Sequence, residues 1–146
     1  MLIDIAKTAA DNMYDLINEA NGTAFTAAEA TLGTPVLFTD PEGLNPRNTQ
    51  MTLSAVPGSG FAGSVDVRYT RLDLETLRDT TDMSFALAES STIETLFARV
   101  IAQLGVVGEA VEFDVAEIPV IPEGQESVVI NLNAKVDSLL YVGSIE

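Results

Sequence analysis

Carboxylates are the side chains of this sequence that could support chemistry, and one cluster of them lies between residues 73 and 82. The acidic residues of that stretch are Asp73, Glu75, Asp79 and Asp82. Carboxylate oxygens bind hard cations such as calcium, but the alternating acidic order, the central glycine and the distal glutamate of an EF-hand loop are missing. We therefore expect a solvated acidic loop whose ion-pair partners, within the chain or across a subunit boundary, are Arg68, Arg71 and Arg78.

Nucleophilic and acid–base catalysis lack their usual residues here. The chain of 146 residues has no His and no Cys, and its Lys and Arg together number only seven. A nucleophilic Ser59 or Ser64 would have no imidazole to activate it, and a lysine-based dyad could use only Lys7 or Lys135. Because no acid, base and nucleophile can be placed together, we expect a protein that is not an enzyme, with no catalytic, cofactor-binding or metal-binding residues.

Two further motifs have structural explanations. The segment Gly58-Ser59-Gly60, with Gly63 beyond it, resembles a phosphate-binding loop, but no Lys-Ser or Lys-Thr pair follows, and a hairpin turn accounts for the glycines. Glu29 and Glu117 end two F-(T/D)-x-A-E segments and could act as paired acids. We expect them instead to close tight turns whose capping residues are Thr26 and Asp114.

The net charge of −15, from 22 acidic residues against seven basic ones, limits the classes of partner. Direct binding to nucleic acid is not expected, because phosphates need basic groups, and these are few and scattered. An anionic membrane surface is disfavoured for the same reason, and no apolar stretch approaches the ~20 residues of a membrane span. Such a charge suits either a merely solvated acidic surface or a partner surface rich in basic residues.

Three short blocks of the sequence occur twice, in the same order. The matching pairs are Thr8–Gly22 with Ser91–Gly105, Phe25–Glu29 with Phe113–Glu117, and Phe61–Val65 with Tyr141–Ile145. A repeated unit of one helix followed by strands is a way to build surface rather than a catalytic centre. We expect a single domain over residues 1–146, made of one pseudo-repeat at about 8–74 and a second at about 83–146.

The first block of each unit predicts a helix. One helix covers about residues 9–20, between a capping Thr8 and Gly22, with a buried stripe at Ala9, Ala10, Met13, Leu16, Ile17 and Ala20. The second begins with the capping box Ser91–Glu94 and ends at Gly105. Its apolar stripe consists of Ile93, Leu96, Phe97, Val100, Ile101 and Leu104.

Strand patterns follow each helix. In the first half, alternation predicts a β-hairpin formed by Gln50–Val56 and Ser64–Leu72. In the second half, it predicts another formed by Ser127–Asn133 and Ser138–Ile145, and a further strand at Met83–Ala88. The expected fold class is α+β, an antiparallel β-rich single domain built from two helix-plus-β-hairpin pseudo-repeats.

A resemblance to one family rests on the segments Gly60–Leu74, Glu126–Lys135 and Ser138–Ser144. In these segments the chain resembles small virion proteins of tailed bacteriophages that form an uncharacterised family. The resemblance spans most of the chain, and its motifs are structural, with no active site among them. It implies a location in the virion after synthesis in the host cytoplasm. The N-terminus agrees, because Asp4 and the lack of a long apolar run argue against a signal peptide.

The leading hypothesis is a non-enzymatic structural component of a bacteriophage particle, as a head decoration, neck or tail protein. Such a protein would assemble with itself as a homo-oligomer and with other virion proteins, through edge strands, apolar loop residues and the extended N-terminal arm at residues 2–6. The long loop over residues 32–48 supplies further apolar candidates. The interface residues that we predict are Leu2, Ile3, Ile5, Val36, Leu37, Phe38, Arg68 and Arg71.

Two alternative functions come from other classes. One is a receptor- or glycan-binding module of a fibre or spike, although the absence of Trp and the presence of only three Tyr leave few rings for stacking on sugars. The other is an acidic regulatory protein that binds a basic host partner, for which the net charge is suitable.

Overall fold

The computed structural model describes residues 3–80, 93–109, 112–114, 123 and 131–145. In these residues the chain forms an α+β fold, with helices and short strands that pair mostly antiparallel. The helices are α1 (Ala9–Asn21), the 3₁₀ helix η1 (Leu74–Thr80) and α2 (Ile93–Leu104). None of the described helices is long and apolar enough to cross a membrane.

Helix α1 begins and ends at the predicted capping residues. The Thr8 hydroxyl accepts a hydrogen bond of 3.0 Å from the Asp11 N–H, which satisfies a free donor of the first turn. Gly22 closes the helix at a φ of 64°, a left-handed conformation that glycine adopts without strain. The predicted stripe is confirmed at Ala9, Met13 and Ile17, whereas Ala20 is exposed.

Helix α2 confirms the second predicted helix over its described residues. Leu96 and Ile101 are buried, and Phe97 and Leu104 pack against the core. Gly105 follows the last turn at a φ of 65° and donates its N–H to the Ile101 carbonyl at 3.0 Å. The predicted capping box begins outside the described residues.

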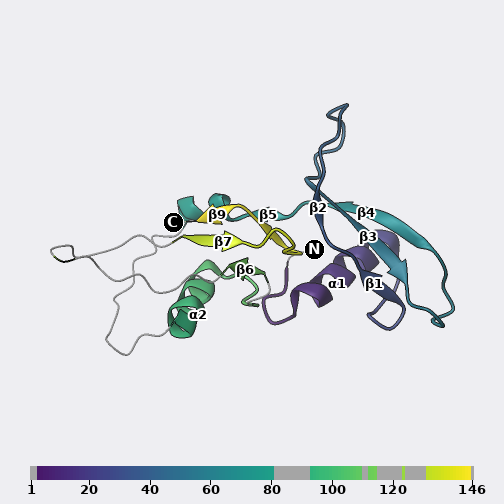
Figure 1. Ribbon diagram of the computed structural model, residues 1–146, viewed down its shortest axis with the longest axis horizontal. Coiled ribbons are helices and arrows are strands. Elements are labelled where there is room, and N and C mark those ends of the chain that lie inside the picture. Colours follow the sequence, from purple (N-terminus) through teal and green to yellow (C-terminus); the bar gives the residue numbers. More distant parts are fainter. Residues whose placement is uncertain (1–2, 81–92, 110–111, 115–122, 124–130, 146) are drawn as a thin grey trace.

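The first half folds into a four-stranded antiparallel sheet. Its strands are β1 (Ala30–Leu32), β2 (Val36–Leu37), β3 (Thr49–Ala55) and β4 (Ser64–Tyr69). Strand β3 pairs with β1 and β2 along one edge and with β4 along the other. The predicted first hairpin is therefore confirmed, although Leu72 leaves it for another sheet. Met51 and Leu53 face inward from β3, in one core with α1 (Figure 1).

The second half has shorter strands. They are β5 (Leu72–Asp73), β6 (Phe113–Asp114), β7 (Leu132–Ala134), β8 (Tyr141–Val142) and β9 (Ser144–Ile145). Strand β7 pairs antiparallel with β6 and β9, and β5 pairs parallel with β8. The predicted return strand at 138–145 is divided by Gly143, whose φ is 77°, so β8 and β9 join different sheets. The predicted strand at Met83–Ala88 lies outside the described residues.

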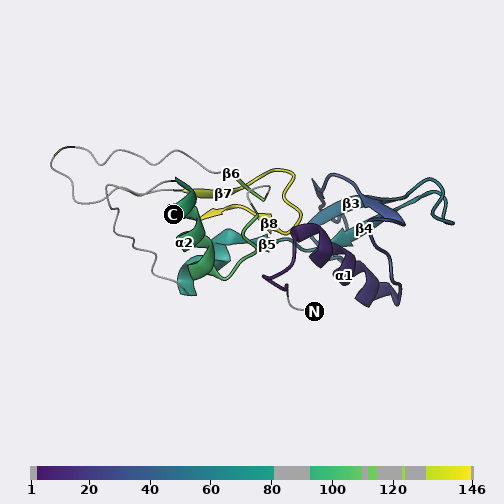
Figure 2. The ribbon, with the colours of Figure 1, turned by 90° about the horizontal axis from the view of Figure 1, so that it is seen from below.

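One apolar core joins the two halves. It draws on α1 and β3 from the first half and on α2, β6 and β8 from the second (Figure 2). The Phe113 and Tyr141 rings stack at 5.2 Å, and the Phe97 ring meets Phe113 edge-on at 5.8 Å. The Tyr141 hydroxyl accepts a hydrogen bond of 2.8 Å from the Val107 N–H. Three of the nine aromatic rings of the chain thus pack together where α2 meets β6 and β8.

Candidate interaction surface

Two of the most exposed apolar side chains among the described residues lie on and beside the loop that joins β2 to β3. We call residues 38–48 the β2–β3 arm, which projects away from the sheets in Figure 1. Leu44 within the arm is 79% exposed and Leu37 at its base is 78% exposed. Apolar side chains this exposed, on a segment that leaves the body of the fold, favour contact with another molecule.

The β2–β3 arm is held by one carboxylate. Asp40 accepts hydrogen bonds from the N–H groups of Glu42, Leu44 and Asn45, at 3.2, 2.9 and 2.7 Å. These backbone donors, with that of Glu42 first, lower the pKa of Asp40 because they stabilise its charged form. Leu44 is therefore presented on an ordered turn.

Two of the predicted interface residues meet at the base of the arm. The Arg68 guanidinium lies over the Phe38 ring, 4.3 Å from its centroid. Arg68 also donates from Nε to the Gln50 side-chain oxygen at 3.0 Å. Val36 is 54% exposed on the same face, because it lies opposite Gln50, which lies opposite Arg68. The structure therefore brings Val36, Phe38 and Arg68 together on one surface, whereas Leu37 lies opposite Thr49 and points to the other face of the sheet.

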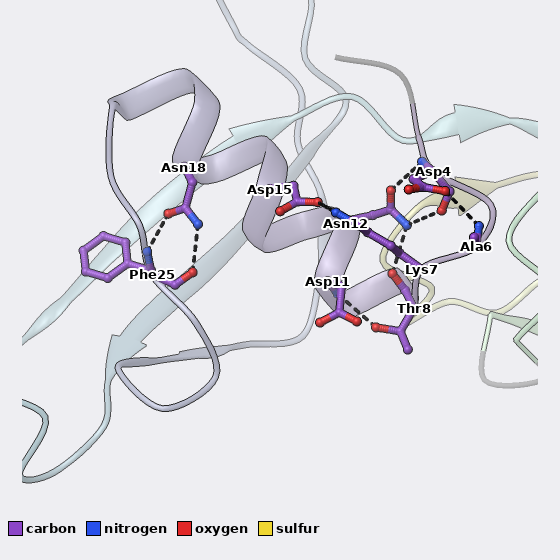
Figure 3. A network of polar contacts seen from close by, with 9 residues as sticks. All are labelled: Asp4, Ala6, Lys7, Thr8, Asp11, Asn12, Asp15, Asn18 and Phe25. Carbon is purple, nitrogen blue, oxygen red and sulfur yellow. Dashed lines mark hydrogen bonds and ion pairs between the residues drawn. The ribbon is translucent and has the colours of Figure 1, made fainter.

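The N-terminal arm is not extended, and in this respect the sequence prediction is wrong. The Lys7 N–H donates to the Asp4 carbonyl at 3.1 Å, which forms a turn. The buried Asn12 side chain accepts from the Asp4 N–H at 2.7 Å and donates to the Asp4 carbonyl at 2.9 Å (Figure 3). This pair of bonds folds the segment back on α1, so Ile3 packs against the core. Ile5 remains 60% exposed, and Leu2 lies outside the described residues.

Two ionic contacts fix the same end of α1. Lys7 donates from Nζ to Asp15 at 2.6 Å (Figure 3), and this hydrogen bond raises the pKa of Lys7. Glu109, from the second half of the chain, accepts a hydrogen bond of 2.5 Å from the Ala9 N–H. A carboxylate at a helix N-terminus interacts favourably with the helix dipole. Glu109 therefore connects the segment that follows α2 to the N-terminus of α1.

Arg71 is buried, which corrects its assignment to the interface. Only 4% of the residue is exposed, and Nε donates to the Thr49 hydroxyl at 3.0 Å. Nη1 donates to the carbonyls of Ser138 and Val136 at 2.9 and 3.2 Å. Burial lowers the pKa of Arg71, because removal from water penalises the charged form. Its hydrogen bonds join the first sheet to the β7–β8 turn and are not available to a partner.

A second buried group, Glu112, was missed by the sequence reasoning. It is 1% exposed and accepts three hydrogen bonds, from the Ser138 hydroxyl at 2.6 Å and the N–H groups of Leu139 and Leu140 at 3.2 and 3.0 Å. Its only sequence signal was an acidic residue in an apolar run. Arg71 and Glu112 therefore bind the same turn, and Arg71 joins this turn to the first half of the chain.

Asn18 was also missed, although it fixes the loop after α1. Its side chain accepts from the Phe25 N–H at 2.7 Å and donates to the Phe25 carbonyl at 2.8 Å (Figure 3). Beyond it, Glu29 accepts from both the N–H and the hydroxyl of Thr26, which lowers the pKa of Glu29. The turn-closing role predicted for Glu29 is confirmed. Asp114 instead pairs with Asn133 inside β6, and Glu117 lies outside the described residues.

A shallow groove of about 570 Å³ lies between residues 5–8 and α2. It is lined mainly by apolar side chains, including Ile5, Phe97, Ala98, Ile101 and Val106. Within the described residues no group of three or more acidic side chains is placed to hold a metal ion. The β2–β3 arm and this groove therefore offer apolar contact area.

Comparison with curated proteins and comparison with solved structures each gave no match. A family comparison did give one, to a family of unknown function designated DUF7941, over residues 3–146. This match covers all of the described elements, from the turn before α1 to β9. The chain therefore belongs to the DUF7941 family.

Proposed function

We propose that this chain is a non-enzymatic structural component of a bacteriophage particle, as a head decoration, neck or tail protein, and that it acts through protein–protein assembly. The observation that carries the proposal is the β2–β3 arm, where Leu44 on the arm and Leu37 at its base are each more than three-quarters exposed. Isolated apolar residues on a surface are ordinary, but here Leu44 lies on a projecting segment, and the strand that leads into it also exposes Val36. The phage assignment itself rests on the resemblance of the segments quoted above.

The arm suits a neighbour that combines an apolar pocket with basic residues. Asp40 and Glu42 lie beside Leu44, and the whole chain has a net charge of −15. A charge of this size repels other acidic proteins and attracts basic surfaces. The partner is therefore another virion protein whose contact surface is less acidic than this chain.

We also propose that the fold is built from two helix-plus-β-hairpin pseudo-repeats. Backbone hydrogen bonds that occur in corresponding places support this. In each bond the N–H of the first residue donates to the carbonyl of the second, and each bond of the first half has a counterpart in the second half. Gly22 to Asn18 corresponds to Gly105 to Ile101, and Val56 to Glu29 corresponds to Lys135 to Glu112. Ala55 to Gly63 corresponds to Ala134 to Gly143, and Ser59 to Val56 corresponds to Ser138 to Lys135. The strand register agrees, because Ala30 lies opposite Ala55 as Phe113 lies opposite Ala134.

This correspondence changes one block of the sequence alignment. By hydrogen bonds Glu29 matches Glu112, whereas the sequence alignment matched Glu29 with Glu117. The matched glutamates have different roles, since Glu29 closes an exposed turn and Glu112 is buried. A duplicated scaffold of this kind supports an assembly role, because the features that its two halves share are turns and strand pairings rather than reactive side chains.

The experiment compares incorporation of variants into particles of the phage that encodes the chain. Mass spectrometry of purified particles is expected to find the wild-type chain at many copies. Leu37→Asp combined with Leu44→Asp is expected to reduce incorporation at least tenfold. The matched control is Val136→Asp, because Val136 is 89% exposed but distant from the arm in sequence, and this variant should incorporate normally.

Two results would overturn the proposal. Absence of the wild-type chain from particles, together with a stable complex with a basic host protein, would support the acidic regulatory alternative. Specific binding of the purified chain to glycans would support the receptor-binding alternative. If the arm variant and the control incorporate equally well, the arm is not the contact surface.

A further inference from the structure

Strand β4 has one edge that no other described strand pairs with. Among the described strands it pairs only with β3, from Ser54 opposite Ser64 to Thr49 opposite Tyr69. Figure 1 shows β4 at the side of the sheet away from β1, with its other edge facing outward. Unpaired edges are templates for another strand. Strand β4 alternates polar and apolar residues and contains no proline that would block pairing.

The hydrogen bonds to β3 determine which residues of β4 point outward. The Ala55 N–H donates to the Gly63 carbonyl at 3.0 Å, so the backbone of Gly63 faces β3. Backbone direction alternates along a strand, so Val65, Val67 and Tyr69 also direct their backbone groups toward β3. The backbone groups of the intervening residues, Ser64, Asp66 and Arg68, therefore face the free edge.

Charge selects one register for pairing with a second copy. In a two-fold antiparallel pair, the outward-facing residues of one strand must lie opposite those of the other. A pair centred on Asp66 would place two aspartates together, and one centred on Arg68 would place two arginines together. A pair centred on Val67 instead places Asp66 opposite Arg68 of the second copy twice, on the face where both side chains already lie with Gln50.

The apolar face of β4 agrees with this register. Val65 is 57% exposed, although it lies opposite the buried Leu53 on the inner face of the sheet. With Val67 at the centre, Val65 of one copy lies opposite Tyr69 of the other. The pair would therefore cover an apolar side chain that the single chain leaves in water.

We propose that two copies of this chain associate by antiparallel pairing of their β4 edges, centred on Val67. This inference names one partner for the proposed assembly function and rests on it. Because it concerns only the purified chain, its failure is distinguishable from failure of the particle assignment. A chain that dimerises but is absent from particles contradicts the phage proposal alone. A chain that is incorporated but never dimerises contradicts the β4 proposal alone.

A cysteine scan tests the register. The natural chain has no cysteine, so each variant has a single thiol. Val67 would face its own copy as a non-hydrogen-bonded pair, with Cα atoms about 4.5 Å apart, within disulfide range. Mild oxidation of Val67→Cys is expected to give a disulfide-linked dimer. The matched control Val65→Cys faces Tyr69 instead, and it should remain unlinked. Equal crosslinking of both variants would overturn the register.

Charge reversal tests the pairing itself. Mass is measured by light scattering across a concentration series at about 0.15 M salt, where repulsion beyond about 8 Å is screened. Asp66→Arg and Arg68→Asp are each expected to weaken self-association at least tenfold, because like charges would lie opposite one another. An equimolar mixture of the two variants restores both opposite-charge contacts and should form a heterodimer, which also shows that each variant folds. A monomeric wild type, or a mixture that stays monomeric, would overturn the proposal.

Discussion

The Ser138 hydroxyl donates a hydrogen bond of 2.6 Å to the Glu112 carboxylate, and both residues are buried. Ser138 in turn accepts a hydrogen bond of 3.0 Å from the Tyr141 N–H, so its hydroxyl connects the carboxylate to the start of β8. Arg71 donates a hydrogen bond of 2.9 Å to the Ser138 carbonyl. This one turn therefore depends on charged groups from both halves of the chain.

Removal of the Glu112 carboxylate is expected to destabilise the fold strongly. Glu112→Ala leaves the Ser138 hydroxyl and two N–H groups without their acceptor, and hydrogen bonds to charged groups contribute about 1.5–3 kcal/mol each. We expect the free energy of unfolding in urea to fall by at least about 3 kcal/mol. The control Glu109→Ala removes one part-buried cap and should cost about 1 kcal/mol. Equal losses in the two variants would contradict the ranking.

Tyr69 and Tyr14 are expected to respond oppositely to the loss of a hydroxyl. The Tyr69 hydroxyl is buried, and within the described part of the chain it has no hydrogen-bond partner. Tyr69→Phe should therefore be neutral or stabilise the fold by about 1 kcal/mol. The Tyr14 hydroxyl donates to the Ala30 carbonyl at 2.7 Å, so Tyr14→Phe should destabilise by about 1–2 kcal/mol. Denaturant unfolding of both variants measures the difference, and a loss at Tyr69 would imply a partner.

Local patterns predicted the elements that depend on near neighbours. The 3.6-residue period and the capping Thr8 located α1, and alternation located the β3–β4 hairpin. The spacing of Thr26 and Glu29 predicted a turn that spans four successive residues. In each case the deciding contacts lie within one turn of a helix or across one hairpin.

The remaining features depend on contacts between distant parts of the chain. Arg71 looked like a surface residue because nothing near it in sequence binds its guanidinium, whose acceptors include Ser138. Asn12 is not part of the predicted apolar stripe of α1, yet its side-chain amide bonds to the Asp4 backbone and is fully buried. The predicted return strand is divided into β8 and β9 because β8 pairs in parallel with β5, where Tyr141 lies opposite Leu72. Such contacts leave no periodic signal.

Alkaline pH is expected to destabilise the protein through Tyr69. Burial raises the pKa of Tyr69 to about 12 from an ordinary value of 10.0. The unfolded chain therefore releases this proton before the folded one, so stability is complete below pH 10 and falls between pH 10 and 12. At about 1.4 kcal/mol per pKa unit, the loss approaches about 3 kcal/mol. Urea unfolding at stepped pH measures it, and Tyr69→Phe should show a smaller decline. Identical declines would contradict the assignment to Tyr69.

Gly143 is expected to tolerate no side chain, because both its conformation and its surroundings exclude one. Its φ is 77°, and a Cβ would lie 2.5 Å from the Asp73 carboxylate oxygen of β5. Gly143→Ala should therefore incur the left-handed penalty of about 1–2 kcal/mol and also displace Asp73 from the β5–β8 pair. Gly58 is the matched control, since its φ is 85° but a Cβ there would meet nothing within 4 Å. We expect Gly143→Ala to destabilise by at least about 1 kcal/mol more than Gly58→Ala in urea unfolding. Equal losses would mean that Asp73 moves aside without cost, and that β5 and β8 are held by their backbone bonds alone.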